Sequence, residues 1–311
     1  MTADIPAGYK LTEVGVIPGD WSESTIGGLI EFQGGSQPEK SVFSNTPRPG
    51  FVRLIQIRDY KSDKFEVFAP TALLRRFCDE NDIMIGRYGP PVFQILRGLS
   101  GAYNVALIKA IPRTAIDREF AYYFLKQDSL FEFIDKLSRR SSGQTGVDLA
   151  ELRQYPLPLP PLPEQRAIAT ALSDVDALLA KLDALIAKKR DLKQATMQQL
   201  LTGQTRLPDF SGEWEVKRLG DVADIDPENL SSGASPQYRF KYISLEDVDI
   251  GTLKGFTEQV FATAPSRARR RLQAGDVLVS TVRPNLMSHL MFKEVGTDWI
   301  SSTGFAVVRC C

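Results

Sequence analysis

One stretch of this chain points to a single, very long helix. Residues 164–201 contain neither glycine nor proline, and Gly203 follows them as a candidate carboxyl-terminal cap. Pro163 suits the first position of such a helix, and Glu164 suits its positive end. At about 1.5 Å per residue the helix would be roughly 57 Å long, against a mean helix of about 11–12 residues. This length favours a specialised rod over a long helix within an ordinary bundle.

The apolar residues of this stretch predict which side of the rod is covered. They recur every three or four residues, with a second row every seven, and so form one broad stripe. The centre of the stripe consists of Leu172, Val175, Leu178, Leu179, Leu182, Leu185 and Ile186. Such a stripe is typical of a helix that packs lengthwise on another helix. We therefore expect these residues to form a helix or subunit interface.

The regions on either side of the rod have a different, strand-like texture. Residues 51–57, 82–88 and 104–111 are short runs of β-branched and aromatic residues bounded by turn formers. Residues 117–137 have helical spacing, and the proline-rich residues 156–163 favour an extended, stiff spacer. The sequence thus predicts an α+β chain in which β-rich, mixed domains flank a coiled-coil-type helix.

The region after the rod partly repeats the region before it. The matched segments are residues 19–29 with 212–222, 53–59 with 241–247, 81–90 with 275–284 and, more loosely, 100–108 with 302–309. A repeat of roughly 190 residues is a whole domain plus its rod. No counterpart of residues 110–206 follows the second copy, so we expect a chain cut short within that copy. Trp21 and Trp214 occupy matched positions of the two copies, and we expect each to anchor the core of its domain.

Composition limits the functions that are possible. The 38 basic and 38 acidic residues cancel, so a polyanion would have to bind a local patch or partner subunits. The three cysteines are too few for a disulfide framework, and the single histidine, His289, argues against a histidine-rich metal site. Without an apolar run long enough for a bilayer and without a secretion signal, the chain is expected to be cytoplasmic and not membrane-bound.

Catalytic motifs are missing from the sequence. It has no phosphate-binding glycine loop, no dinucleotide-binding glycine pattern and no Asn/Asp-Pro-Pro-aromatic motif for adenine methylation. A loose nuclease-like pattern of Asp209, Glu215 and Lys217 falls in a linker, and the matching linker of the first copy lacks it. We therefore predict a non-enzymatic chain that needs no cofactor and no metal.

Residues 143–225 resemble the central conserved region of type I restriction–modification DNA specificity subunits. The resemblance is carried by the proline-rich lead, Glu164, Gln165 and Arg166, the basic residues 188–190, MQQLLTG at 197–203 and WEVKRLGDVADI at 214–225. The remainder of the chain is similar more weakly, because target-recognition domains vary with the DNA that they read. The resemblance implies three parts, namely a first target-recognition domain (1–155), the spacer and rod (156–206) and an incomplete second target-recognition domain (207–311).

The resemblance also implies partners and a function. In this family two target-recognition domains read the two halves of a split site on double-stranded DNA, methyltransferase subunits dock along the helical spacer, and a restriction and translocase subunit completes the complex. Two base clusters roughly 34–36 Å apart need a stiff separator, and a rod of roughly 57 Å is long enough. Two alternatives remain open. The chain is a half-subunit that pairs with itself through the rod and reads an inverted repeat, or it is a coiled-coil adaptor without a DNA role.

Basic and polar residues at strand ends and in loops are the candidates for DNA contact. Arginine binds phosphate or guanine, and glutamine binds adenine. The candidates are Arg87 and Tyr88, Arg139, Arg140 and Gln144, Arg269 and Arg270, and Thr281 and Arg283. Arg87 and Thr281 belong to matched segments just after a strand, and Arg139 precedes a loop of small polar residues. For each candidate a structural or plain surface role is the alternative.

Overall fold

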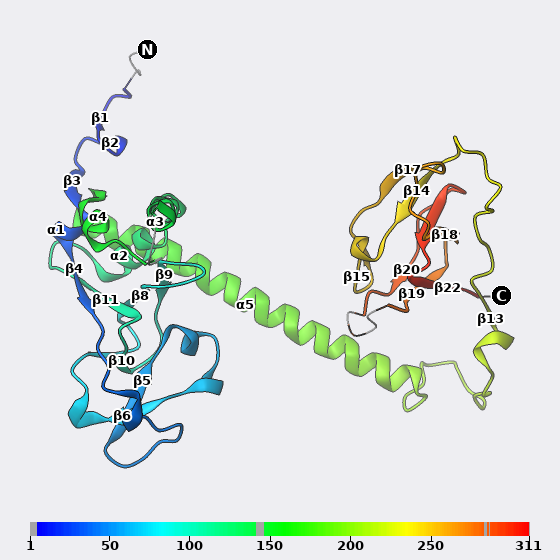
Figure 1. Cartoon of the computed structure of the whole chain (residues 1–311), viewed down its shortest axis with the longest axis horizontal. Helices are drawn as coiled ribbons and strands as arrows, with labels where there is room; N and C mark the ends of the chain where they lie inside the picture. The colour runs from blue at the N-terminus through cyan, green and yellow to red at the C-terminus, as the bar shows by residue number, and fades with distance from the viewer. Residues whose placement is uncertain (1–4, 141–145, 283–284, 286, 311) are drawn as a thin grey trace. The chain divides into compact units, whose positions relative to one another are not determined.

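The computed structural model describes residues 5–140, 146–282, 285 and 287–310. The chain divides into two compact units, Met1–Gln194 and Ala195–Cys311 (Figure 1). Among the described helices, none combines the length and the apolar character that a bilayer crossing requires. Both units contain short strands and short helical turns, and the first also contains longer helices, among them most of a 40-residue one. The predicted α+β class is therefore confirmed.

The first unit is built on two four-stranded sheets. One has the order β6-β5-β10-β7, in which β5 and β10 are parallel, and the other has the antiparallel order β4-β11-β8-β9. The strands are β4 Ile30–Gly34, β5 Phe51–Ile55, β6 Phe68–Pro70, β7 Phe77–Cys78, β8 Ile83–Gly86, β9 Gln94–Leu96, β10 Gly101–Tyr103 and β11 Leu107–Pro112. Strands β5, β8 and β11 fall on the three predicted strand-like runs, which are therefore confirmed.

Shorter elements complete the first unit. They are the hairpin of β1 Tyr9–Thr12 and β2 Gly15–Pro18, the helices α1 Ile26–Leu29 and α4 Leu149–Gln154, and the 3-10 turns η1 Lys40–Val42, η2 Ile57–Tyr60, η3 Asp63–Phe65 and η4 Thr71–Leu73. The proline-rich segment is extended, as predicted, but it is only in part a free spacer. Its residues Pro156–Leu159 form β12, which pairs antiparallel with β3, Ser22–Thr25. The strand preceding the rod therefore belongs to the body of the first unit.

The single helix predicted over residues 117–137 is wrong, because the structure has two helices there. These are α2, Arg118–Leu125, and α3, Asp128–Arg140. Phe124 is buried in α2 and Leu130 in α3, and the two positions are six residues apart. Two turns of helix take about seven residues, so one continuous helix would turn these side chains to different faces. The break between α2 and α3 lets both reach the same core.

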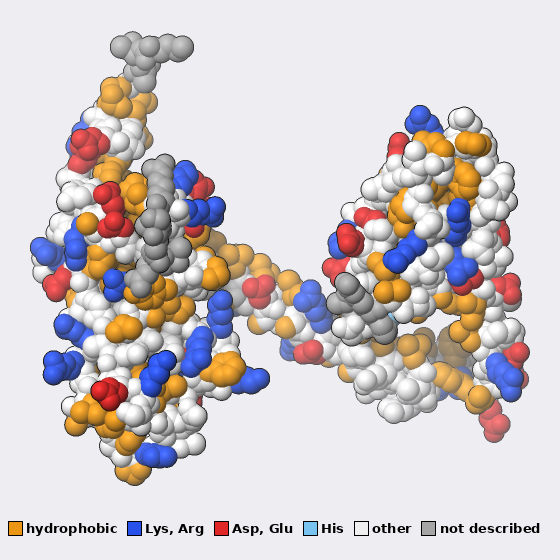
Figure 2. All heavy atoms as spheres, in the orientation of Figure 1, with side chains coloured by type: hydrophobic (Ala, Val, Ile, Leu, Met, Phe, Trp, Pro, Cys, Tyr) orange, Lys and Arg blue, Asp and Glu red, His pale blue; other side chains and the backbone are white. Residues whose placement is uncertain are grey.

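The predicted rod is confirmed as α5, Leu162–Leu201, which is 40 residues long and begins two residues before the predicted start. Only its beginning is embedded in the first unit, where Gln165 and Ala169 are buried. The Gln165 amide donates to the carbonyls of Ala115 (3.2 Å) and Pro160 (2.8 Å), and its Oε1 accepts the N–H of Asp117 at 2.8 Å. Residues 170–199 are exposed in the chain, and Figure 2 shows hydrophobic side chains along this part.

The second unit repeats the topology of the first. Its sheets have the orders β17-β14-β21-β18, with β14 and β21 parallel, and β13-β22-β19-β20. The strands are β13 Ala223–Ile225, β14 Arg239–Ile243, β17 Thr257–Val260, β18 Ala268–Arg271, β19 Val277–Ser280, β20 Leu290–Met291, β21 Trp299–Ser302 and β22 Phe305–Cys310. The hairpin of β15 Val248–Asp249 and β16 Thr252–Leu253 and the turns η5 Leu219–Asp221 and η6 Leu245–Asp247 are added. The predicted repeat is therefore present strand by strand.

The loosest of the four predicted matches is out of register. In the first unit Leu107 pairs with Gly86, and in the second Phe305 pairs with Ser280. Gly86 and Ser280 are equivalent in the match of residues 81–90 with 275–284, so Leu107 is equivalent to Phe305. The match of residues 100–108 with 302–309 is wrong for this reason. Short β-rich segments contain few distinctive side chains, so sequence similarity alone does not fix their alignment. The hydrogen-bonded registers of β11 on β8 and of β22 on β19 provide the correct one.

The two tryptophans do not play the same part. Trp21 is half-buried, and its indole N–H donates to the Glu164 carboxylate at the start of α5 (3.0 Å). Trp214 is 54% exposed, so the expectation that it anchors a core is wrong. The guanidinium of Arg206 lies over the Trp214 ring, 5.6 Å from its centre.

The buried amide of Gln165 should be the main polar attachment of α5 to the first unit. In Gln165→Ala the N–H of Asp117 and the carbonyls of Ala115 and Pro160 lose their partner, and we expect the free energy of unfolding of that unit to fall by about 2–4 kcal/mol. Urea denaturation of the whole chain measures the change. Gln194→Ala, an exposed glutamine on the same helix, is the control and should change stability by less than about 0.5 kcal/mol. Equal midpoints for both variants would contradict the assignment.

Candidate nucleic-acid interface

Two groups of predicted residues come together in the first unit. The N–H of Arg87 donates to the carbonyl of Ala106 (2.8 Å), and the carbonyl of Arg87 accepts the N–H of Val147 (3.0 Å). Tyr88 forms a β-bridge with Gly146, and the Arg87 guanidinium lies 5.4 Å from the centre of the Tyr88 ring. The end of β8 therefore lies beside the residues that close the loop carrying Gln144, which itself is outside the described residues.

An open groove of about 560 Å³ adjoins this strand end. Its lining residues are Gly89, Pro90, Pro91 and Val92 after β8, and Phe131, Asp135, Ser138 and Arg139 on α3. The Arg139 side chain is 77% exposed and pairs with Asp135 at 2.7 Å. An exposed pair of this kind contributes only about 0–1 kcal/mol, so Arg139 is free to exchange the carboxylate for a phosphate. Arg140 ends α3, and its side chain lies outside the described residues.

The second unit has a hollow at the equivalent strand end. Ser280, the last residue of β19, lines a space of about 520 Å³ together with two basic residues, Arg267 and Lys254, and two acidic residues, Glu246 and Asp249. The N–H and the hydroxyl of Thr281 both donate to the carbonyl of Gly304 at 3.0 Å, which fixes the chain as it leaves β19. Arg283 lies outside the described residues.

The predicted arginines of β18 have their own partners. Arg270 pairs with Asp226 at 2.8 Å and donates to the Asn229 side-chain oxygen at 2.9 Å. The Arg269 guanidinium lies over the Phe261 ring, 5.4 Å from its centre. Arg270 is thus held within its unit, which favours the structural alternative for this residue. Arg269 is half-buried against an apolar ring and forms no ion pair within the described part of the second unit.

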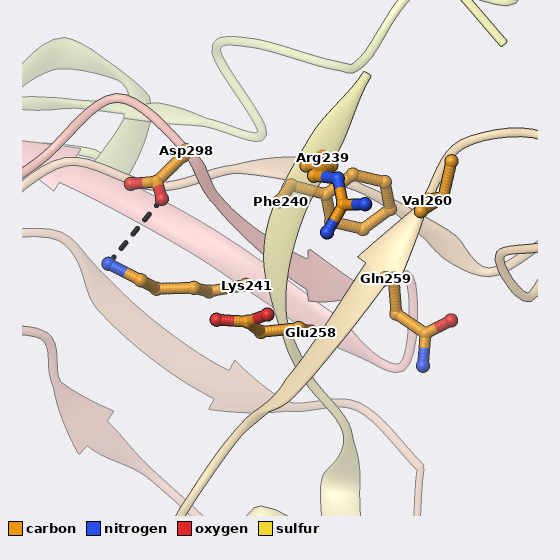
Figure 3. A pocket seen from close by; sticks show the side chains of 7 residues that line it. All are labelled: Arg239, Phe240, Lys241, Glu258, Gln259, Val260 and Asp298. Atoms are coloured by element: carbon orange, nitrogen blue, oxygen red, sulfur yellow. Dashed lines mark ion pairs between the residues drawn. The ribbon is translucent and has the colours of Figure 1, made fainter. Parts of the chain in front are cut away.

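A pocket of about 280 Å³ on the sheet of β14 is electrically balanced. It is lined by Arg239 and Lys241 on β14, by Glu258 and Gln259 on β17, and by Phe240, Val260 and Asp298 (Figure 3). Lys241 pairs with Asp298 at 3.4 Å and lies 4.8 Å from the centre of the Trp299 ring. Two basic and two acidic side chains leave no net charge for a polyanion here. Over the described part of the chain, no three His, Cys, Asp or Glu residues are arranged to hold a metal ion.

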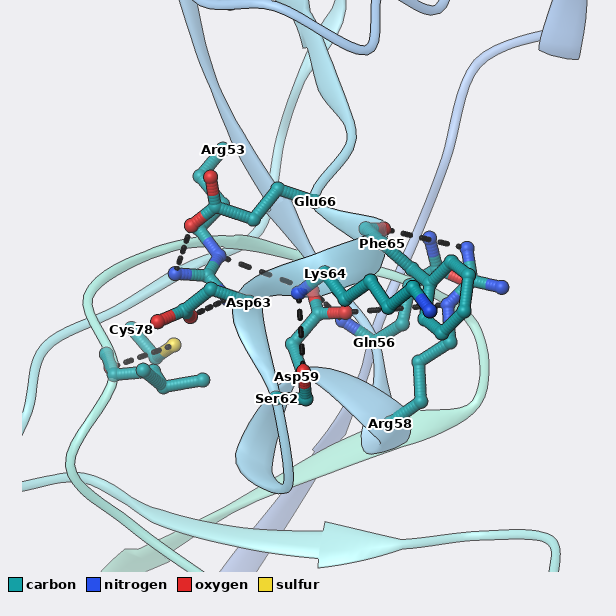
Figure 4. A network of polar contacts seen from close by, with 11 residues as sticks. Arg53, Gln56, Arg58, Asp59, Ser62, Asp63, Lys64, Phe65, Glu66 and Cys78 are labelled. Atoms are coloured by element: carbon teal, nitrogen blue, oxygen red, sulfur yellow. Dashed lines mark hydrogen bonds and ion pairs between the residues drawn. The ribbon is translucent and has the colours of Figure 1, made fainter.

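A basic cluster on η2 and η3 was missed in the sequence. Arg58, Lys61 and Lys64 are exposed, and the charged ends of Arg58 and Lys64 lie 5.3 and 5.6 Å from the centre of the exposed Phe65 ring (Figure 4). In Figure 2, Lys and Arg side chains gather on the part of the first unit that holds β5 and β6. Basic residues interleaved with aromatic ones over residues 48–77 were the signal for this cluster. The cluster resembles a phosphate-binding surface with a ring for apolar contact.

One arginine explains why this cluster keeps its positive charge. Arg53 collects the neighbouring carboxylates, at 3.8 Å for Asp59, 2.9 Å for Asp63 and 2.6 Å for Glu66. Burial raises the pKa of the Asp59 carboxyl, whose Oδ2 accepts the N–H of Gln56 and closes η2. Asp63 and Glu66 thus pair with Arg53, and Asp59 also lies 4.0 Å from Arg58. Lys61 and Lys64 are the cations of the cluster that form no ion pair with these carboxylates in the described structure.

The equivalent turn of the second unit has the same backbone hydrogen bonds but different charges at its exposed positions. Asp247 closes η6 through Ser244 as Asp59 closes η2, so the backbone device is the same. The exposed positions of this turn, however, include Glu246 and Asp249. Basic side chains are thus not needed to form the turn. Their presence in the first unit is a property of its surface alone.

The apolar stripe of α5 lies open in the chain. Its exposed fractions are 42% for Leu172, 55% for Val175, 56% for Leu178, 53% for Leu179, 46% for Leu182, 50% for Leu185 and 48% for Ile186. These residues were predicted as an interface, and within the chain nothing covers them over the described residues 170–199. Apolar patches of this extent usually mark interaction surfaces.

Comparison with known proteins gives a family and a fold. Residues 18–188 match the family described as type I restriction modification DNA specificity domain. The type I restriction enzyme MjaVIII specificity subunit of Methanocaldococcus jannaschii is 25% identical over 86% of this chain and 65% of its own length. The type I restriction enzyme MjaIX specificity subunit of the same organism is 24% identical over 70% of this chain and 55% of its own length. The chain thus spans between about half and two thirds of the length of these relatives.

Solved structures of low identity have a similar fold. An S subunit of a type I restriction–modification system from M. genitalium is 17% identical, with a TM-score of 0.50 over 93% of this chain and 72% of that one. A chain from a study of complex assembly and conformational transition of the type I system is 17% identical, with a TM-score of 0.53 over 94% of this chain and 76% of that one. At this identity the likeness concerns the fold alone.

The environment of Arg270 gives a prediction about stability. Arg270→Ala removes the ion pair of Asp226 and the hydrogen bond to Asn229, so the free energy of unfolding of the second unit should fall by about 1–3 kcal/mol. Arg267→Ala, which removes an exposed arginine from the same region, should leave stability unchanged. Thermal unfolding followed by circular dichroism compares the two. If both variants melt with the parent chain, the structural role of Arg270 is excluded.

Proposed function

This chain belongs to the family of type I restriction modification DNA specificity domains, and we propose that it reads the sequence of double-stranded DNA without acting on it chemically. The observation that carries the proposal is the meeting of Arg87, Tyr88 and Gly146 beside the groove that holds Arg139. A strand end that carries Arg87 and Tyr88, with Arg139 nearby, supplies both base contacts and a phosphate contact. The absence of catalytic motifs from the sequence agrees with a reader that leaves chemistry to partners.

We assign different tasks to the two kinds of basic residue. Arg87, Tyr88 and the predicted residue Gln144 read bases, because Arg87 and Tyr88 directly follow the end of β8 and Tyr88 bridges to Gly146. Arg139, Arg140 and the cluster of Arg58, Lys61 and Lys64 bind phosphates and set the position of the duplex. The formal net charge of zero implies that these patches act locally and that partner subunits add to the affinity.

The repeat supports reading of a split site. Both units have the same strand order, and both have a hollow beside the end of the equivalent strand, β8 or β19. We propose that each unit reads one half of the site and that α5, roughly 60 Å long at 1.5 Å per residue, is the spacer. In this division residues 1–155 and 207–311 are the readers, and residues 156–206 are the spacer and rod.

We further propose that the exposed side of α5 is a scaffold for methyltransferase subunits, with a restriction and translocase subunit joining the complex. The seven apolar side chains at the centre of the stripe are half-exposed, and burial of one such side chain contributes about 1.5–3 kcal/mol. A partner that covers them has enough driving force to dock lengthwise. Such a complex would act on DNA in the cytoplasm.

A second candidate function rests on the same stripe. Two copies of the chain could cover each other's α5 as an antiparallel pair, which would make the chain a half-subunit that reads an inverted repeat. A two-fold interface of this kind is self-complementary. A coiled-coil adaptor without a DNA role would also use the stripe, but it would not need the arginines of the first unit. Binding of DNA separates that function from both others.

The first experiment tests the phosphate contacts at the end of α3. In the complex with its methyltransferase subunits, Arg139→Ala with Arg140→Ala should weaken binding to a pool of random duplexes and lower the salt slope by roughly one to two units. Lys136→Ala, an exposed lysine on the same helix, is the control and should leave the slope unchanged. A slope that the double variant does not alter would remove both arginines from the interface.

The second experiment tests self-association through α5. Sedimentation of the chain alone should show a dimer, and Leu182→Lys should give a monomer because it places a charge in the middle of the stripe. Ala184→Lys adds the same charge on the opposite side of the helix and should keep the dimer. A well-folded monomer of the parent chain at every concentration would leave only the scaffold role for the stripe.

A further inference from the structure

Equivalent apolar residues of the two units differ in how far other elements of the chain cover them. Three core residues of the first unit have counterparts on the surface of the second. The pairs are Ile26 (0% exposed) with Leu219 (55%), Leu29 (5%) with Val222 (43%) and Phe32 (8%) with Ile225 (53%). The equivalence follows from the gapless match of residues 19–29 with 212–222, and from the same register of β4 and β13 on their neighbouring strands. Side chains at equivalent positions are therefore buried in the core of the first unit and exposed on the surface of the second.

In the first unit the covering elements come from residues 118–169. Helices α2 to α4, strand β12 and the beginning of α5 contribute to the core around Ile26 and Leu29, together with strands β8 and β11. Strand β12 pairs with β3 over four residue pairs, and the carbonyl of Tyr155 accepts the N–H of Ile26 at 2.9 Å. Helix α4 lies so close that a Cβ on Gly27 would be 2.7 Å from the Cβ of Arg153.

In the second unit the same surface is open. Residues 215–218, the counterparts of β3, form no strand in the described structure, and Val216 among them is fully exposed. Gly220, the counterpart of Gly27, has no heavy atom within 4 Å of an added Cβ. Trp214, the counterpart of Trp21, is more than half exposed, but its ring lies against Gly203 and Arg206 after α5 and not on this surface. We call the surface of Val216, Leu219, Val222 and Ile225 the open face.

We propose that the open face is a docking surface for a polypeptide segment with the pattern of residues 118–169. Such a segment has helices capped by aspartate, a Pro-Leu-Pro-Leu strand and the first turns of a helix that begins with glutamate. The first unit shows this occupant on an equivalent surface, and this internal precedent identifies it. The inference does not depend on whether the chain reads DNA.

Physical chemistry favours this occupant over an unspecific apolar partner. The backbone of residues 215–218 offers hydrogen bonds to an added strand, as in peptide recognition by strand addition. Proline is tolerated in a strand at the edge of a sheet, where its missing N–H is not needed, so the Pro-Leu-Pro-Leu strand suits this place.

The test uses the whole chain and a probe polypeptide made of residues 113–175 of the same sequence. In hydrogen exchange, a large excess of the probe should slow the amides of residues 213–225 at least tenfold. Gly220→Leu should abolish this protection, because the new side chain would occupy the space that Arg153 of the probe needs. Its unfolding temperature should match that of the parent chain, since the position is open.

A matched control and two contrary outcomes make the test decisive. Gly255→Leu, at another position in the second unit with open space around its Cβ, should keep the protection. Unchanged exchange of residues 213–225 in the presence of the probe would overturn the proposal. Self-association through this surface that Gly220→Leu abolishes and the probe does not disturb would overturn the assigned occupant.

Discussion

The organisation of this protein depends on the need to cover apolar side chains. Helix α5 satisfies this need only at its beginning, where Gln165 and Ala169 are buried in the first unit. From residue 170 onward the helix keeps an apolar stripe that the chain does not cover. A stripe of this kind is costly in water, which is the reason for our proposal that the helix receives a partner. The account of the rod as a scaffold, and the alternative of a self-paired rod, both start from this constraint.

The two units show how one framework can carry different surfaces. Strand order, the parallel central pair and the aspartate-closed turn after β5 and β14 are the same in both. Charge differs at the exposed positions of that turn, where Arg58 and Lys61 in one unit contrast with Glu246 and Asp249 in the other. Buried and hydrogen-bonded positions are constrained by the fold, whereas exposed positions are free to vary with the molecule that they contact. A family of DNA readers needs this separation.

Features with a regular period were the most predictable from the sequence. The rod and its stripe follow from helical spacing, and the repeat follows from matched strand-like runs. The break between α2 and α3 was not predicted. Both helices have apolar residues at helical spacing, and this spacing alone does not show where one helix ends and the next begins. The exposed state of Trp214 was also unforeseen, since the burial of a side chain depends on which elements cover it. The cluster of Arg58, Lys61 and Lys64 was overlooked because its charge depends on Arg53 collecting the nearby carboxylates.

Sequence selectivity is the central claim, and enrichment from a random duplex pool measures it most directly. The chain, assembled with its methyltransferase subunits, should enrich a defined sequence over repeated rounds of binding. Replacement of residues 87–92 and 139–147 by the corresponding loops of another specificity subunit should change one part of that sequence and leave the remainder unchanged. Enrichment of no sequence, or of the same complete sequence after the replacement, would contradict the account.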